Sequence, residues 1–151
     1  MSHLDIATQC RIRRPLDIVR AHFVDFRHHI ERDVHKGIKY TILGEESGKQ
    51  RVAAEFKVLG VPKRDEILAY VNDEGAVIQD FVVGDFAGGQ LRIDFHEVDS
   101  TTTELHATIK APLRGINKLL APVIRRVVVK LTDKTIAEDI HDLENTGYQP
   151  S

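Results

Sequence analysis

The chain has 151 residues, of which 42% are hydrophobic and 29% are charged, and its formal net charge is -2 at pH 7. This length suits one folded domain with a buried core, and the near balance of charges excludes a strongly basic nucleic-acid-binding protein. A single cysteine, Cys10, excludes a disulfide framework and a thiolate zinc cluster. The chain has no apolar run of about 18 residues and no apolar leader segment, so we expect a cytoplasmic protein without stable membrane insertion.

Residues 4–12 predict the first strand, because apolar side chains alternate there with polar ones. Pro15 follows and is typical of a first helical turn. The next apolar residues recur at spacings of three and four, which predicts a helical segment. They are Leu16, Val19, Phe23, Phe26, Ile30 and Val34. Gly37 is a helix-stop signal, so the segment is expected to end there.

After Gly37 the hydrophobic period changes to two, which predicts strands. Six strand candidates follow, at residues 38–43, 49–59, 64–71, 76–83, 90–98 and 103–111. Their short, glycine-rich connections predict antiparallel neighbours. From Leu113 the pattern is helical again, and we expect one long helix from about Asn117 to Asn145.

This order of elements predicts an α+β fold. A single antiparallel sheet needs a cover for its apolar face, and only the C-terminal helix is long enough to provide one. The sheet is therefore expected to curl around that helix, with the first helical segment closing one end.

The element order and two stretches resemble the helix-grip superfamily, often called SRPBCC. The stretches are RRPLDIVRAHFVDF after the first strand and APLRGINKLLAPVIRRVVVKL before the last helix. The superfamily joins START lipid-transfer domains, birch-pollen-allergen proteins and polyketide cyclases. The resemblance covers nearly the whole chain and implies one SRPBCC-like domain over residues 1–151. It implies a seven-stranded curled antiparallel sheet around a long C-terminal helix, with a short helical pair after the first strand.

The resemblance also implies a hydrophobic cavity between helix and sheet. Alternation in residues 49–59 and 90–98 places one apolar face of each strand inward, and the C-terminal helix carries a matching apolar arc. Phe86 is included because the loop GDFAGG could gate the cavity mouth; a plain hairpin loop is the alternative. The predicted ligand-binding residues are Phe26, Tyr40, Val52, Ala54, Phe56, Phe86, Ile93, Phe95, Val123, Val127 and Leu131.

Four of the eight histidines lie in the short stretch HFVDFRHHIERDVHKG, among acidic residues. An imidazole has a pKa near neutrality and suits acid–base catalysis. The candidate catalytic residues are therefore His28, His29 and His35. A solvated helix face is the alternative interpretation of the same stretch.

A metal site is a further interpretation, because two imidazoles and one carboxylate form the facial site of non-haem iron enzymes. Rieske oxygenase catalytic domains are distant members of the superfamily. The spacing Asp25-x-x-His28 resembles the first part of their iron motif, Asp-x-x-His-x4-His. The six residues between His28 and His35 depart from that motif. The candidate first shell is His28 or His29 with His35 and Glu138.

Glu138 and His141 also form a Glu-x-x-His pair, a spacing found in metal-binding helical bundles. An exposed acidic helix end is the alternative explanation of this pair. Iron or zinc is the candidate cofactor of such a site.

Two functions follow from these observations. In the first, the protein binds a hydrophobic small molecule (a lipid, polyketide, isoprenoid or aromatic metabolite), with cyclase, aromatase or dehydratase chemistry by histidines as an extension. In the second, it is a non-haem iron or zinc-dependent enzyme with a His/His/carboxylate site. The sequence does not separate an enzyme from a carrier. A nucleic-acid partner is not expected, and a homodimer is a further expectation.

Overall fold

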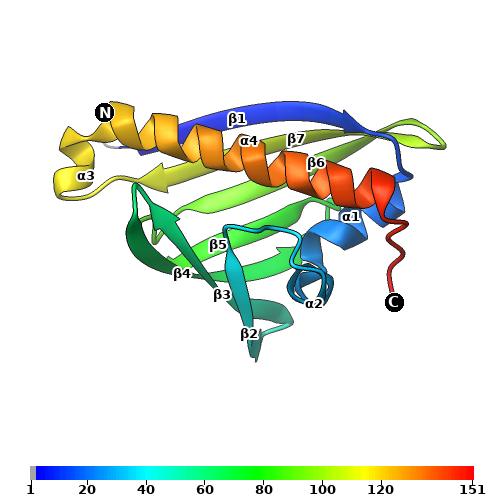
Figure 1. Cartoon of the computed structure of the whole chain (residues 1–151), viewed down its shortest axis with the longest axis horizontal. Helices are drawn as coiled ribbons and strands as arrows, with labels where there is room; N and C mark the ends of the chain where they lie inside the picture. The colour runs from blue at the N-terminus through cyan, green and yellow to red at the C-terminus, as the bar shows by residue number, and fades with distance from the viewer. Residues whose placement is uncertain (1–2) are drawn as a thin grey trace.

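The computed structural model describes residues 3–151. The elements are β1 His3–Ile12, α1 Leu16–Val24, α2 Phe26–Glu31, β2 Lys39–Glu46, β3 Lys49–Val58, β4 Val61–Val71, β5 Val77–Val83, β6 Gln90–Asp99, β7 Thr102–Pro112, α3 Ile116–Leu119 and α4 Ala121–Asn145. The long helix α4 lies across the curled sheet, and α1 and α2 lie at one end of it (Figure 1). In the described residues, no helix is long and apolar enough to cross a membrane.

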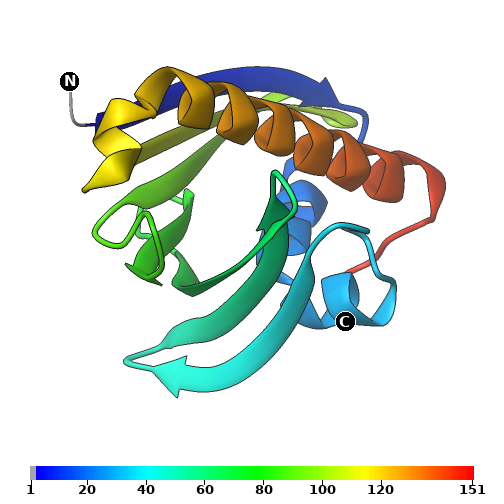
Figure 2. The same cartoon turned by 60° about the vertical axis from the view of Figure 1, so that its left-hand side comes forward.

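The strands form one seven-stranded antiparallel sheet in the order β1-β7-β6-β5-β4-β3-β2. Strands β2 to β7 each pair with their neighbours in the chain, as their short connections predict, and β1 pairs with β7. Figure 2 shows β2 and β3 bending away from β1 and β7, so that the sheet wraps around the inner side of α4. The predicted helix-grip architecture is confirmed.

The helical segment after β1 breaks into α1 and α2 at Asp25. The backbone of Asp25 has φ -91° and ψ 73°, which is not helical, and its carboxylate accepts a hydrogen bond from the backbone N–H of His28 at 3.1 Å. An aspartate in this position caps the first turn of the new helix. The apolar stripe is therefore shared by two short helices and a loop that carries Val34.

The C-terminal helix begins later than the sequence pattern predicts. We expected a helix from about Asn117, whereas residues 116–119 form the separate short helix α3 and α4 begins at Ala121. The break falls at Leu120, with φ -98° and ψ 15°. Pro122 lies in the first turn of α4, where its missing N–H costs no helical hydrogen bond, so the chain restarts its helix there.

The core that positions the site lies at the α1 and α2 end. Val19 and Phe23 of α1 pack there with Leu143 of α4 and with Leu105 of β7. A second buried group joins α2 to the sheet through Phe26. These contacts fix α1 and α2 against the last turns of α4, where four of the eight histidines of the chain meet carboxylates of α4.

Candidate functional site

A cavity of about 480 Å³ lies between α4 and the inner face of the sheet. Most of its wall is apolar and comes from α4 and from strands β3 to β6. Nine of the eleven predicted ligand-binding residues line it: Phe26, Tyr40, Ala54, Phe56, Phe86, Ile93, Val123, Val127 and Leu131.

The other two residues of that prediction, Val52 and Phe95, lie outside the cavity lining. Val52 is fully buried and packs with Phe26 and Ile67. The ring of Phe95 packs against that of Phe23, with 6.0 Å between the ring centroids. Both side chains face inward as the alternation predicts, but the helical pair covers this end of the sheet and fills the space in front of them.

The sheet also supplies polar side chains to the cavity, which the sequence interpretation missed. Lys63 and Asp65 of β4, Gln79 of β5 and Asp85 of the following loop line it. The Lys63 ammonium nitrogen lies 2.9 Å from an Asp85 carboxylate oxygen. Burial, and then the neighbouring charge of Asp85, raise the pKa of Asp65 to about 6.

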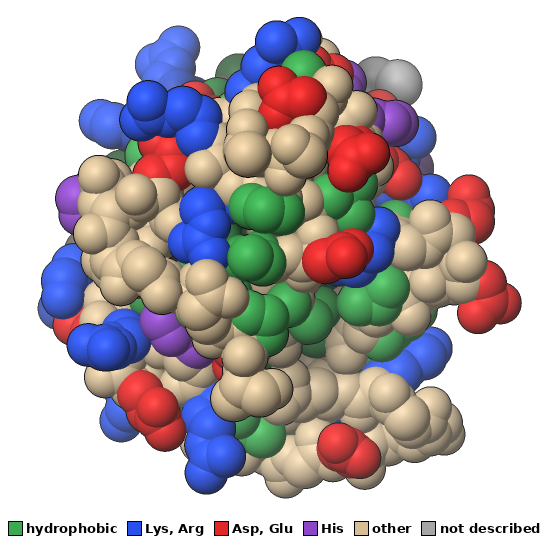
Figure 3. Space-filling model, turned by 90° about the vertical axis from the view of Figure 1, so that its right-hand side faces the viewer, with side chains coloured by type: hydrophobic (Ala, Val, Ile, Leu, Met, Phe, Trp, Pro, Cys, Tyr) green, Lys and Arg blue, Asp and Glu red, His purple; other side chains and the backbone are tan. Residues whose placement is uncertain are grey.

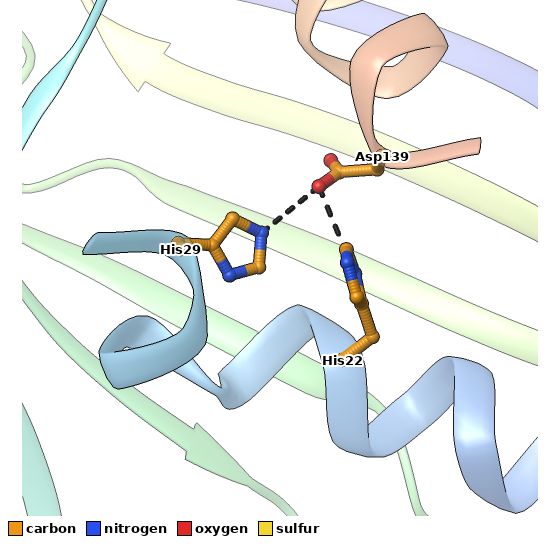
Figure 4. A group of neighbouring side chains, drawn as sticks. All are labelled: His22, His29 and Asp139. Atoms are coloured by element: carbon orange, nitrogen blue, oxygen red, sulfur yellow. Dashed lines mark hydrogen bonds and ion pairs between the residues drawn. The ribbon is translucent and has the colours of Figure 1, made fainter. Parts of the chain in front are cut away.

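The polar end of the cavity is formed by His29, His35 and Asp139. Behind them lie His22 of α1, His28 of α2 and Asp142 of α4. We call these six residues the histidine–carboxylate cluster. Figure 4 shows three of its members, His22, His29 and Asp139, pointing toward one another from three different helices.

One oxygen atom, Asp139 Oδ1, lies at the centre of the cluster. It is 2.9 Å from His29 Nε2, 3.2 Å from His35 Nε2 and 3.7 Å from His22 Nδ1. Burial acts to raise the pKa of Asp139, but the hydrogen bonds with His29 and His35 outweigh it and hold the pKa below its usual range. Asp139 is therefore an anion at neutral pH although it is buried.

The second carboxylate, Asp142, holds the other side of the cluster. Its Oδ2 lies 2.8 Å from His22 Nε2 and 2.6 Å from His28 Nε2. Its Oδ1 accepts a hydrogen bond from the Thr146 hydroxyl at 3.0 Å. These contacts fix the orientation of both imidazole rings.

The outward ring nitrogens of His29 and His35 have partners of their own. His29 Nδ1 lies 2.8 Å from the backbone carbonyl oxygen of Asp25, and His35 Nδ1 lies 3.1 Å from Glu138 Oε1. The Tyr148 hydroxyl donates to the Asp25 carboxylate at 2.8 Å, which ties the C-terminal segment to the same region. Both rings are therefore held from outside with their second nitrogen turned toward Asp139.

The pKa values of two cluster histidines shift in opposite directions. Burial lowers the pKa of His22 to about 4, despite the nearby charge of Asp139. Burial also acts to lower the pKa of His35, but hydrogen bonds to Asp139 and Glu138 outweigh it and raise this pKa above its usual range. The cluster thus pairs a neutral imidazole with one that holds a proton readily, which suits proton transfer.

The structure brings the predicted histidines together and favours the buried interpretation of their stretch. His29 and His35 are buried, line the cavity and face α4; His28 faces Asp142 and lies outside the cavity lining. Figure 3 looks onto the end that carries α1 and α2, where only small areas of histidine surface appear. The solvated-face alternative is therefore wrong for His29 and His35.

The predicted partners on α4 are only partly present in the cluster. Glu138 contacts His35, but His141 is exposed and contacts Asn145 instead, so the Glu-x-x-His pair does not converge on one point. The central carboxylates, Asp139 and Asp142, were missed. The spacing Leu131, Thr135, Asp139 continues the cavity-facing row of α4 in steps of four and would have found the first of them.

No family model and no curated protein sequence matches the chain. Solved structures do match it. A START-superfamily protein from Mycobacterium smegmatis has a TM-score of 0.77 at 11% identity, covering 94% of this chain and 98% of that one. The Zhui aromatase/cyclase from Streptomyces sp. R1128 has a TM-score of 0.74 at 16% identity, covering 97% and 99%.

A plant structure extends the comparison. The ginseng major latex-like protein 151 from Panax ginseng has a TM-score of 0.69 at 11% identity, covering 95% of this chain and 99% of that one. At these identities the likeness concerns the fold. The chain has the helix-grip fold of the START-superfamily protein, the aromatase/cyclase and the major latex-like protein.

Proposed function

We propose that the protein binds a hydrophobic small molecule in the cavity beneath α4. The observation that carries the proposal is a largely apolar cavity of about 480 Å³ in whose wall His29, His35 and Asp139 are grouped. Its volume lies within the range of about 300–1,000 Å³ common for small-molecule sites. A lipid, polyketide, isoprenoid or aromatic metabolite fits this lining, and the START and aromatase/cyclase neighbours support that choice.

The polar groups of the cavity wall would determine how such a ligand is oriented. His29, His35 and Asp139 are the groups of the cluster that face the cavity. Imidazole N–H groups donate hydrogen bonds and a carboxylate accepts them, so a ligand hydroxyl or carbonyl group is expected beside these groups. The apolar remainder of the ligand then contacts Phe56, Val127 and the rest of the apolar wall.

The test uses N-phenyl-1-naphthylamine, an uncharged probe that fluoresces in apolar surroundings. We expect Val127→Asp to weaken probe binding at least about ten-fold, because probe binding would bury the new carboxylate. Ala137→Asp is the matched control, since it adds the same charge at an exposed position of α4. Circular dichroism checks the fold of each variant.

Val127→Phe covers the case in which Val127→Asp does not fold. The larger ring stays apolar but occupies part of the cavity, so probe binding should again fall while the fold is kept. Probe affinity equal to that of the wild type in both folded variants would overturn the binding proposal.

A second candidate function is acid–base chemistry of the cyclase, aromatase or dehydratase type. The observation that favours it is that His29 and His35 both line the cavity. One imidazole would take a proton from a methylene carbon of the ligand, and the resulting enolate would add to a ketone carbon of the same chain. The other imidazole would protonate the new alkoxide to a hydroxyl. Removal of a second proton from the same methylene carbon and protonation of that hydroxyl would then release water. Loss of water from a linear poly-β-keto thioester, followed by mass spectrometry, tests this. A rate with the wild-type protein that equals the rate without protein would contradict this function. A rate with His35→Gln that equals the wild-type rate would contradict it as well.

The alternative of a non-haem iron or zinc-dependent enzyme rests on a different observation. The ligand atoms of His22, His29 and Asp139 all lie within 4.8 Å of one another, and those of His22, His28 and Asp142 do so too. Homodimerisation and a cytoplasmic location remain predictions.

A further inference from the structure

The buried ring of His22 has one nitrogen without a hydrogen-bond partner. Its Nε2 lies 2.8 Å from Asp142 Oδ2, and because a carboxylate only accepts, the ring hydrogen lies on Nε2. Nδ1 then carries a lone pair. In residues 3–151 it is the one fully buried side-chain nitrogen or oxygen atom with no hydrogen-bond partner. His22 Nδ1 lies 3.7 Å from Asp139 Oδ1. Both atoms are acceptors, so no hydrogen lies between them.

His29 repeats this arrangement. Its Nδ1 lies 2.8 Å from the Asp25 carbonyl oxygen, which can only accept, so the hydrogen of a neutral ring lies on Nδ1. In this neutral form the lone pair on His29 Nε2 faces Asp139 Oδ1 at 2.9 Å, and a hydrogen bond forms between them only when the ring takes up a second proton. His35 has the same form, with Nδ1 toward Glu138 and Nε2 at 3.2 Å from Asp139 Oδ1. In their neutral forms, three rings therefore aim acceptor atoms at one anionic oxygen.

Such a convergence of acceptors in a buried space requires positive charge between them. Extra protons are one source and can serve His35, but a second proton on His22 would make an imidazolium ion of a ring that is fully buried. A metal ion is the other source, and it can take the lone pairs of His22 and His29 at once. Metal-binding histidines usually donate the hydrogen of the outward nitrogen to a carboxylate or carbonyl oxygen, as all three rings do here.

We propose that His22 Nδ1, His29 Nε2 and Asp139 Oδ1, which lie within 4.8 Å of one another, bind one divalent transition-metal ion. The Asp139 oxygen lies 2.9 Å from the His29 nitrogen and 3.7 Å from the His22 nitrogen. Ligand atoms of a tetrahedral site with bonds of about 2.0–2.1 Å are separated by about 3.3 Å, so small shifts complete the site. Imidazole and carboxylate ligands suit Zn²⁺ or Fe²⁺.

This set differs from the one that the sequence suggested. His22 and Asp139 replace His28, His35 and Glu138 as ligands beside His29, and Asp142 becomes the outer partner that orients His22. His29, His35 and Asp139 also line the cavity, so the ion would lie at its polar end. Metal binding does not depend on the hydrophobic-ligand proposal, because either site can be assayed without the other ligand.

The test begins with protein purified without a histidine tag and stripped with a chelator. Titration with Co²⁺ is expected to give one ion per chain, visible absorption bands of nitrogen-coordinated cobalt, and a rise in melting temperature. Zn²⁺ should displace Co²⁺, whereas Mg²⁺, which prefers oxygen ligands, should not. Folded wild-type protein that binds no stoichiometric Co²⁺ or Zn²⁺ would overturn the proposal.

Variants then locate the ion. His29→Gln and Asp139→Asn should each weaken Co²⁺ binding at least about a hundred-fold, and Asp142→Asn about ten-fold through His22. His141→Gln is the control, since this exposed histidine of α4 lies outside the cluster. Unchanged affinity in folded His29→Gln and Asp139→Asn would place the ion elsewhere and overturn the assignment.

If these variants do not fold, the wild-type protein still decides the question. X-ray absorption of the Co²⁺ form measures how many imidazole ligands the ion has, and fewer than two would overturn the proposed set. Naphthylamine binding is measured on the metal-free protein, so failure of metal binding and failure of hydrophobic-ligand binding are seen separately.

Discussion

Two carboxylates at the cavity have opposite surroundings, and their pKa values move in opposite directions. Asp139 is surrounded by imidazoles, whose hydrogen bonds overcome the effect of burial and lower its pKa. Asp65 is partly buried beside another carboxylate, Asp85, and its pKa rises to about 6 although Lys63 acts against the rise. The fold therefore stabilises Asp139 as an anion. Asp65 is also ionised at neutral pH, but its ionisation raises the free energy of the folded state.

This difference predicts a pH-dependent effect of Asp65→Asn. The pKa of Asp65 in the folded state is above its value of about 4 in an unfolded chain. The raised pKa therefore contributes fully to stability below about pH 4. The contribution is lost as the pH rises through about 6. Asn is neutral throughout, so we expect the variant to raise the free energy of unfolding at pH 8 by about 1 kcal/mol, a value reduced for solvent screening.

Urea unfolding at pH 8 and at pH 4 measures the effect. The difference between Asp65→Asn and the wild type should shrink toward zero at pH 4, where both side chains are neutral in the folded state. Asp133→Asn, an exposed change on α4, is the control and should show a small difference at both pH values. A difference that is equally large at pH 4 would contradict the raised pKa.

At the residue scale the sequence predicted the histidines of the site better than its carboxylates. His29 and His35 stand out because they are rare residues in a dense stretch. Asp139 does not stand out, because the last turns of α4 contain several acidic residues. Which of them is buried depends on how α4 is rotated against α1 and α2, and that rotation is fixed by packing between distant segments.

At the element scale, the loop between β5 and β6 allows very little space for side chains. A Cβ atom added to Gly89 would lie 2.5 Å from the Ala111 Cβ and 2.7 Å from the Lys110 carbonyl oxygen of β7. These atoms belong to a strand that is paired on both sides, so they cannot move away easily. Glycine at this position lets the chain enter β6 against β7.

Gly89→Ala is therefore expected to lower the free energy of unfolding by about 2–3 kcal/mol, the cost of overpacking against a rigid backbone. Gly37→Ala is the matched control. Its added Cβ would lie 3.4 Å from Lys134 Nζ, the end of a flexible side chain, and little change is expected. Urea unfolding of both variants measures this, and a cost for Gly89→Ala as small as that for Gly37→Ala would contradict the close approach.

The elements themselves were largely predictable, because the change from period 3.6 to period 2 after Gly37 is a local property of the sequence. Their exact ends were not. The second strand runs on to Glu46 through a register shift between Ile42 and Gly44, and such a bulge leaves no mark on the alternation. The start of α4 depends on the break at Leu120, and the sequence pattern is helical on both sides of that residue.

At the scale of the whole molecule, the cavity follows from the topology. The helix α4 packs on β1, at one edge of the sheet, while α2 packs on β2, at the other edge. The two edges are thus held apart, and the curled sheet between them cannot collapse onto the apolar face of α4. The space that would otherwise be core remains open beside the histidine–carboxylate cluster.

An open apolar cavity implies that the protein is less stable than the same fold with a filled interior, and Ala54→Leu tests this. Ala54 of β3 lines the cavity, so a leucine there gains apolar burial without displacing a packed neighbour. We expect the free energy of unfolding to rise by about 1 kcal/mol and naphthylamine affinity to fall about ten-fold. Ala137→Leu, exposed on α4, should change neither quantity. Urea unfolding and probe fluorescence measure the two effects together. A stable Ala54→Leu protein with full probe affinity would place the probe outside the cavity, whereas a destabilised one would show that the cavity lacks room at β3.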